Sequence, residues 1–163
     1  MRIEDWPARL AAAIETARNK PFVWGRHDCG LFMADCCLAM TGADPAAAFR
    51  GRPVAAPPVN NFRCHKWQPA YRTRRGAAGA LKRYAGGGLA QAMERSFADL
   101  GWPEIAPGFA QRGDAVLFAA LDIETALDAQ AAGICTGAML CFAGPAGLDF
   151  APMSAALRAW KVG

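Results

Sequence analysis

Residues 21–42, PFVWGRHDCGLFMADCCLAMTG, predict the central element of this 163-residue chain. An extended approach is broken at Gly25, a residue type that tolerates the backbone of a tight turn. From residue 28 to residue 40, apolar side chains recur at helical spacing along one stripe, and Gly42 supplies a C-terminal stop. The stretch therefore predicts a buried helix over residues 28–40 that carries Cys29 in its first turn.

The segments on either side of this helix differ in character. Apolar residues recur at i, i+4 and i+7 near the N-terminus, whereas the C-terminal part consists of short apolar runs separated by glycines. We expect a first helix from a cap at Asp5 to about residue 20, another over 74–84 after a cap at Thr73, and a further one from the glycines at 86–88 to Leu100. We expect strands from Asp114, in the runs AAGICTG, AMLCFAG and GLDFAP, and over 157–162. This order predicts an α+β domain with N-terminal helices packed on a C-terminal antiparallel sheet.

One long segment interrupts this pattern. Residues 51–70, GRPVAAPPVNNFRCHKWQPA, include four prolines and show no periodicity, which predicts a long loop. A loop of this length inside a compact domain is usually functional or an insertion. We therefore expect one domain over residues 1–163 with a proline-rich insertion at about 51–70.

Composition restricts the classes of protein to which the chain can belong. Hydrophobic residues make up 53% and charged residues 20%, so a buried core is expected and disorder is not. We expect no membrane span and no signal peptide, because no apolar run is long enough and charges interrupt the N-terminus. The net charge is +4, and basic residues cluster between Arg63 and Arg83. This cluster is either a phosphate-contacting face or a solvated helix face, and since no nucleic-acid-binding motif accompanies it, we expect no nucleic-acid partner.

The six cysteines match no disulfide or metal pattern. Their spacing is irregular, CxxC is absent, and Cys36 and Cys37 are adjacent on the predicted helix, so their side chains diverge. Cys64 and His65 could join a thiolate metal site, although their spacing matches no known motif. We therefore expect no metal and no cofactor, and we expect most of the cysteines to be buried free thiols.

Cys29 differs from the other cysteines because of its place in the predicted helix. The first turn of a helix presents unpaired N–H groups and the positive end of the helix dipole, both of which favour a thiolate. From these residues alone, Cys29 is either a nucleophile at the edge of a cleft or a buried structural thiol. Asp28, directly before it, is either an orienting acid or the N-terminal cap of the helix.

The motif W-G-x-x-D-C, the apolar helix after it and a strand opened by Gly-Asp in the C-terminal half together resemble the NlpC/P60 superfamily of papain-like cysteine hydrolases. The chain more closely resembles an NlpC/P60-like family found among phage, prophage and gene-transfer-agent tail genes. The matching blocks keep their order and cover roughly half of the chain; they are PFVWGRHDCGLFMADCCLAMTGADPAAAFRGR, YRTRRGAAGALKRY, RGDAVLF and LRAWKVG.

The resemblance implies an antiparallel sheet packed on helices and the cleavage of peptidoglycan stem peptides. Cys29 would attack an amide carbonyl and form a thioester, which water then hydrolyses. The implied location is the virion tail, or the host cytoplasm during assembly. The implied partners are tail hub or baseplate proteins, with peptidoglycan peptides as the substrate if the site is active.

The sequence departs from that family at the histidine that would complete the catalytic pair. Ala131 occupies the corresponding position, in the run AAGI. Loss of an imidazole removes about two to four orders of magnitude of proton-transfer catalysis. The general base is then His27, two residues before Cys29, or His65 in the proline-rich segment, or it is absent.

Two functions are compatible with these observations. The first is a cysteine hydrolase of cell-wall peptides with Cys29 and His27 as its catalytic residues. The alternative is a non-catalytic structural virion protein that docks on the tail hub or baseplate. In that case the proline-rich segment, with Trp67, Phe62 and Val59, would be the docking arm.

Overall fold

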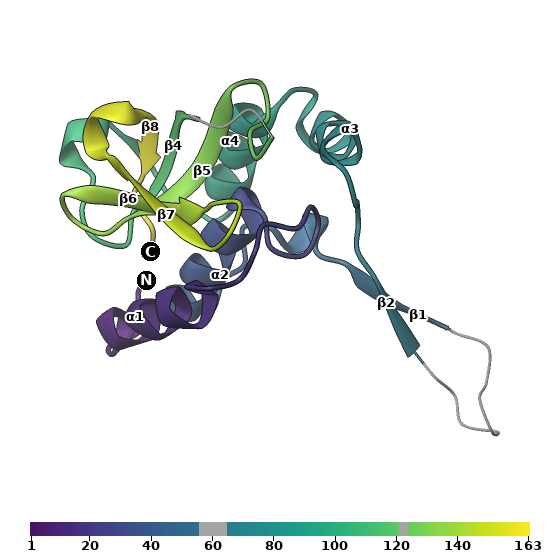
Figure 1. Ribbon diagram of the computed structural model, residues 1–163. Helices are drawn as coiled ribbons and strands as arrows, with labels where there is room; N and C mark the ends of the chain where they lie inside the picture. The colour runs from purple at the N-terminus through teal and green to yellow at the C-terminus, as the bar shows by residue number, and fades with distance from the viewer. Residues whose placement is uncertain (56–64, 121–123) are drawn as a thin grey trace.

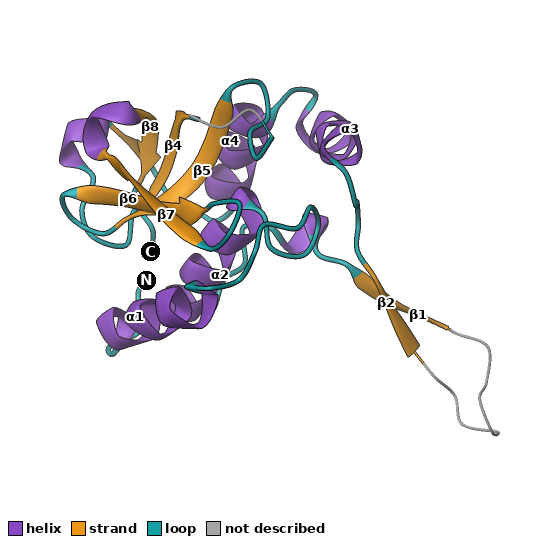
Figure 2. Ribbon diagram, viewed as in Figure 1, coloured by secondary structure: helices purple, strands orange, loops and turns teal. Residues whose placement is uncertain are grey.

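The computed structural model describes residues 1–55, 65–120 and 124–163. Its body has helices on one side and a six-stranded antiparallel sheet on the other (Figure 1, Figure 2). The helices are α1 (Trp6–Ala17), α2 (Cys29–Thr41), α3 (Arg74–Ala85) and α4 (Leu89–Asp99). Within the described ranges, none of them is long and apolar enough to cross a membrane. The predicted α+β class, with N-terminal helices and a C-terminal antiparallel sheet, is confirmed.

The large sheet has the strand order β3-β8-β4-β5-β6-β7, and every neighbouring pair is antiparallel. Its strands are β3 (Glu104–Ile105), β4 (Ala115–Ala119), β5 (Gln130–Cys135), β6 (Met139–Ala143), β7 (Leu148–Pro152) and β8 (Ala156–Trp160). β5, β6 and β7 form the meander expected from the glycine-separated runs, and β8 is the expected last strand. The sequence does not predict β3, because two residues are too short for a periodic signal.

α2 is the central helix of the body. It packs against α1 on one side and against β5 and β6 on the other, and eight of its residues are buried. It begins at the predicted place because the Asp28 carboxylate accepts a hydrogen bond from the backbone N–H of Leu31 at 3.0 Å. It ends before Gly42, whose φ of +77° lies in the left-handed region that glycine adopts without strain.

α1 also begins at the predicted place, but without the expected cap. The Asp5 carboxylate accepts from Nε of Arg9 at 2.6 Å and makes no capping hydrogen bond. The prediction of Asp5 as a cap is therefore wrong. The Arg9 guanidinium, four residues later on the same helix face, donates to the Asp5 carboxylate instead. Thr73 is confirmed as the cap of α3, since its hydroxyl accepts from the N–H of Gly76 at 3.0 Å.

Part of the segment predicted as a loop is a two-stranded β-ribbon. β1 (Arg52–Ala55) and β2 (His65–Gln68) pair antiparallel, so the prediction of a loop throughout 51–70 is wrong at both ends of the segment. The prolines hide the strands from sequence analysis. Pro53 lies opposite Trp67 in a sheet of two strands, where each strand is an edge and tolerates a missing N–H donor. Figure 1 shows the ribbon projecting away from the body.

A buried ion pair ties the two ends of the chain to the start of β4. The Arg2 guanidinium lies 2.5 Å from the Asp114 carboxylate, whose side chain is 3% exposed. The same carboxylate accepts from the backbone N–H groups of Gln111 at 2.8 Å and Val162 at 3.3 Å. Nε of Arg2 donates to the carbonyl oxygen of Val162 at 2.8 Å, which brings the termini together as Figure 1 shows. One carboxylate thus fixes residues from both ends of the chain.

We expect Asp114→Asn to lower the free energy of unfolding by about 2–4 kcal/mol. The substitution leaves the guanidinium of Arg2 without its anion and weakens the acceptor of two backbone N–H groups. Urea denaturation followed by circular dichroism measures the change. As a control, Arg9→Gln breaks an exposed ion pair with Asp5 and should leave the free energy of unfolding unchanged. Equal stability of Asp114→Asn and the wild type would contradict this role of the pair.

Candidate functional site

The Asp28 carboxylate is the polar centre of the candidate site. It is 2% exposed and accepts three hydrogen bonds: from the N–H of Gly25 at 2.9 Å, the N–H of Leu31 at 3.0 Å and the Tyr71 hydroxyl at 2.7 Å. Burial raises the pKa of this carboxyl, and the three hydrogen bonds act in the opposite direction. The carboxylate joins the turn before α2, the first turn of α2 and the segment after the ribbon. The interpretation of Asp28 as a helix cap is confirmed.

The turn before α2 is fixed by a backbone bridge and by its glycine. Val23 and His27 exchange two backbone hydrogen bonds, of 2.8 and 2.9 Å. Gly25 between them has a φ of +74°, and a Cβ at this position would collide with the carbonyl oxygen of Tyr71. Both the conformation and the close approach therefore require glycine here.

Cys29 begins α2 and lies against β5. The residue is 2% exposed, and burial raises the pKa of its thiol from 9.0 to about 12, with the negative charge of Asp28 acting in the same direction. Backbone hydrogen bonds with Ala132 and Gly30 lower the pKa but do not offset the burial. The expectation that the helix start favours a thiolate is therefore wrong for this structure, because removal from water outweighs the N-terminal field of the helix.

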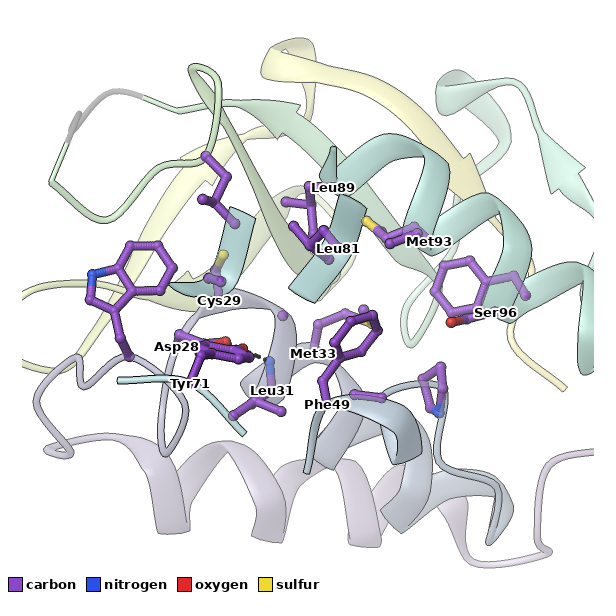
Figure 3. A pocket seen from close by; sticks show the side chains of 18 residues that line it. Asp28, Cys29, Leu31, Met33, Phe49, Tyr71, Leu81, Leu89, Met93 and Ser96 are labelled. Atoms are coloured by element: carbon purple, nitrogen blue, oxygen red, sulfur yellow. Dashed lines mark hydrogen bonds between the residues drawn. The ribbon is translucent and has the colours of Figure 1, made fainter. Parts of the chain in front are cut away.

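An apolar pocket lies beside Cys29, between α2, α3 and α4 (Figure 3). Asp28 and Tyr71 lie at its edge, and the rest of its wall is mostly apolar, including Met33, Phe49, Leu81, Leu89, Met93 and Phe97. The cavity volume is about 50 Å³. Sites that enclose drug-sized ligands typically measure about 300–1,000 Å³. In this conformation the pocket has room for a small apolar group and not for a stem peptide.

The structure places His27 outside the set of residues that line the pocket beside Cys29. Its ring packs edge-to-face on Phe32 at 6.0 Å between centroids, and Phe32 lines the groove between α1 and α2. Burial, and then the positive charge of Lys20, lower the pKa of the imidazole. Its Nε2 is buried without a hydrogen-bond partner, and among the described residues no hydrogen bond joins the ring to the Cys29 thiol. His27 as a general base remains a prediction that requires the ring to move.

The other residues singled out by the sequence lie on β5 and on the ribbon. Ala131 is buried in β5, opposite Phe118 of β4, and directly precedes Ala132, whose backbone contacts the Cys29 thiol. His65 is in β2, opposite Ala55, and Cys64 falls outside the described residues together with Phe62 and Val59. Over the ranges that the structure describes, no three His, Cys, Asp or Glu side chains are grouped as metal ligands.

Tyr71 is the site residue that sequence analysis missed. Its hydroxyl donates to Asp28 across 43 positions of sequence, and Asp28 also raises the pKa of this phenol, after burial. No spacing rule joins two residues so far apart. The one available signal is that Tyr71 opens YRTRRGAAGALKRY, one of the blocks on which the family resemblance rests.

Comparison with known proteins gives one match. A family model described as "Domain of unknown function (DUF6950)" matches residues 1–54 and 61–162, which is nearly the whole chain. The unmatched residues 55–60 fall inside the segment predicted as a proline-rich insertion. No curated protein and no solved structure matches the chain.

We expect the Cys29 thiol of the folded protein to react with iodoacetamide at least about a hundredfold more slowly at pH 8 than in the urea-unfolded chain. Burial raises the pKa of this thiol from 9.0 to about 12, which makes the thiolate fraction at pH 8 about a thousandfold smaller, and burial also limits access of the reagent. Peptide mapping by mass spectrometry follows Cys29 separately from the other cysteines. Labelling of Cys29 at equal rates in the folded and unfolded chains would contradict the buried, protonated thiol.

We expect Tyr71→Phe to lower the free energy of unfolding by about 1–3 kcal/mol at neutral pH, because a buried carboxylate loses one of its donors. Loss of this donor raises the pKa of Asp28 further, and a group whose pKa is raised on folding loses stability as the pH rises through the folded-state value. The deficit should therefore be largest at neutral pH, shrink as the pH falls through the raised folded-state pKa of Asp28, and be smallest below the ordinary Asp pKa of 3.8.

Urea denaturation at several pH values measures this deficit. Tyr84→Phe is the matched control, since the Tyr84 hydroxyl lies 3.2 Å from the neutral Ser96 hydroxyl and its loss should not vary with pH over this range. A pH-independent deficit for Tyr71→Phe would show that the hydrogen bond to Asp28 does not cause it.

Proposed function

We propose that this protein, which belongs to the DUF6950 family, is a non-catalytic NlpC/P60-like protein that acts as a structural component of a phage-type tail. The observation that carries the proposal is the state of Cys29. By the resemblance, the residue holds the position of a papain-like nucleophile and Ala131 stands where the family's histidine would be, yet Cys29 is 2% exposed and burial raises the pKa of its thiol.

The arrangement around Cys29 supports an NlpC/P60-like ancestry. A cysteine begins a central helix, and that helix packs on an antiparallel sheet. The backbone of Ala132 on β5 contacts the thiol, next to the position that the resemblance assigns to the histidine. The matching sequence blocks occur in the order that this arrangement requires.

The chemistry of the site argues against hydrolysis by this conformation. With a thiol pKa of about 12, about one molecule in 10⁵ carries a thiolate at pH 7. The imidazole of His27 packs on Phe32, and the cavity beside the sulfur is too small for a peptide. The thiol is thus a poor nucleophile, the imidazole is not placed to act as its base, and the pocket does not accept a peptide. A binding role requires none of these three features.

The tail assignment rests on the resemblance to tail-gene products. This resemblance implies that the protein is located in the virion tail, or in the host cytoplasm during assembly. It also implies that tail hub or baseplate proteins are the partners. A structural role in a tail requires a stable body and an exposed surface for neighbours, and the buried carboxylates of Asp28 and Asp114 supply the first of these.

One observation favours the hydrolase as the second candidate. Cys29 still lines a pocket at the N-terminus of α2, and a movement of the turn at 23–27 that exposed the sulfur to water would remove the burial that opposes the field of the helix. Contact with a tail partner or with peptidoglycan would have to drive that movement. Peptidoglycan stem peptides would then be the substrate, with His27 as the base.

We expect wild type and Cys29→Ala to release the same negligible amount of peptide from purified peptidoglycan, measured by chromatography and mass spectrometry of the soluble products. A Cys29-dependent product would overturn the non-catalytic proposal, and loss of that product in His27→Gln would identify the base.

Purified tail particles from cells that encode the protein should contain it in a fixed ratio to the hub protein, measured by quantitative mass spectrometry. Its absence from the particles would overturn the structural role.

A further inference from the structure

Charge is divided unevenly along the chain. Residues 45–93 contain nine of the 18 lysines and arginines and none of the 14 acidic residues. This segment therefore carries a formal charge of +9, and the rest of the chain carries −5. The segment comprises the ribbon, α3 and the first turns of α4.

Arg50 of this segment pairs with Asp35 and Asp44, whereas most of the segment's other described cations are unpaired. Six are described as exposed, and none makes an ion pair within the described residues; they are Arg52, Arg72, Arg74, Arg75, Lys82 and Arg83. Seven acids of the chain already pair with arginines: Asp5, Glu15, Asp35, Asp44, Glu94, Glu104 and Asp114. In a second copy of this chain, these seven acids are already neutralised by arginines of their own chain.

The ribbon is an incomplete sheet. β1 and β2 pair with each other, and both are edge strands. Two-stranded ribbons are marginally stable in water and gain from a further strand or a packed face. Pro53 removes one donor from the β1 edge, whereas every residue of β2 keeps its N–H. An extended segment of a partner can therefore be added most favourably beside β2.

Trp67 gives this edge an apolar anchor. Its side chain belongs to β2 and the residue is 51% exposed, although tryptophan is costly to leave in water. Nε1 of its indole lies close against Gly51, where a Cβ would be only 2.6 Å away. Trp67 also borders a groove of about 260 Å³ whose other lining residues include Leu31 and the exposed Arg26. Exposed tryptophan and arginine are the residues most enriched in binding hot spots.

We infer that β2, Trp67 and the arginines at the start of α3 form a docking surface for an acidic protein segment, which adds a strand to the ribbon. The inference rests on the proposed structural role, because the segment then belongs to a tail partner. Five residues separate β2 from α3, so Arg72, Arg74 and Arg75 follow directly on the edge strand. A nucleic acid would satisfy the cations, but it would leave the ribbon edge open, and this favours a protein.

The test uses the full-length protein and a synthetic peptide of alternating glutamate and valine, which favours the extended conformation and carries acids on one face. A peptide of alternating lysine and valine and a short DNA duplex are the comparison probes. Fluorescence anisotropy of labelled probes at about 50 and 200 mM salt measures the affinities. The wild type should bind the glutamate peptide at least about tenfold more tightly than the lysine peptide.

Two variants locate the binding. The triple variant Arg72→Glu, Arg74→Glu, Arg75→Glu should weaken glutamate-peptide binding at least about tenfold, and Trp67→Ala at least about fivefold. The matched controls are Arg112→Glu and Phe109→Ala, an exposed cation and a 77% exposed aromatic outside the segment. Unchanged thermal unfolding midpoints show that the variants fold. Equal losses in controls and variants, no preference for acid, or tighter binding of the DNA duplex would each overturn the inference.

Tail particles separate this inference from the proposed function. If the protein is absent from particles but binds the glutamate peptide through Trp67 and the arginines, the tail role fails and the docking surface stands. If particles contain the wild type and the triple variant in equal amounts, the tail role stands and the docking surface fails. Loss of the triple variant and of Trp67→Ala from particles that still contain Arg112→Glu supports both.

Discussion

The structure depends on one buried carboxylate that accepts three hydrogen bonds. The Asp28 carboxylate accepts hydrogen bonds from the N–H of Gly25, the N–H of Leu31 and the hydroxyl of Tyr71. These bonds hold together the turn before α2, the central helix α2 and the segment after the ribbon. A carboxylate at 2% exposure would be costly without these donors. Because each donor comes from a different segment, the position of α2, and with it the position of Cys29, follows from satisfying this single charge.

The same arrangement decides the chemistry of Cys29. A helix N-terminus stabilises a nearby anion by roughly 0.3–1 kcal/mol at an exposed position and by up to about 2 kcal/mol when it is partly buried. The rise of the thiol pKa from 9.0 to about 12 corresponds to about 4 kcal/mol against the thiolate. Burial under β5 therefore prevails over the helix, and the neighbouring charge of Asp28 adds to it. The surroundings of Cys29 thereby disfavour the thiolate that a nucleophile requires.

Local signals in the sequence predict the four helices and the meander of the body, but not β3. The boundaries of α2 follow from Asp28 and Gly42, and the meander follows from glycines between apolar runs, because caps and turns act over a few residues. The sequence does not predict the ribbon, since its strands are short and Pro53 contradicts the usual strand pattern. The thiol pKa, the orientation of His27 and the partnership of Tyr71 with Asp28 all depend on tertiary contacts, which no spacing in the sequence encodes.

The two halves of the molecule satisfy their charges in different ways. In the body, Asp28 is satisfied by hydrogen bonds, Asp114 and Arg2 neutralise each other, and Arg158 pairs with two glutamates. Around the ribbon, cations and Trp67 remain in water with no acidic residue between positions 45 and 93. Desolvating unpaired cations without an opposing charge is unfavourable, so any partner must bring the anions itself. The ribbon side therefore supplies the cations to which, in our proposal, an acidic partner segment binds.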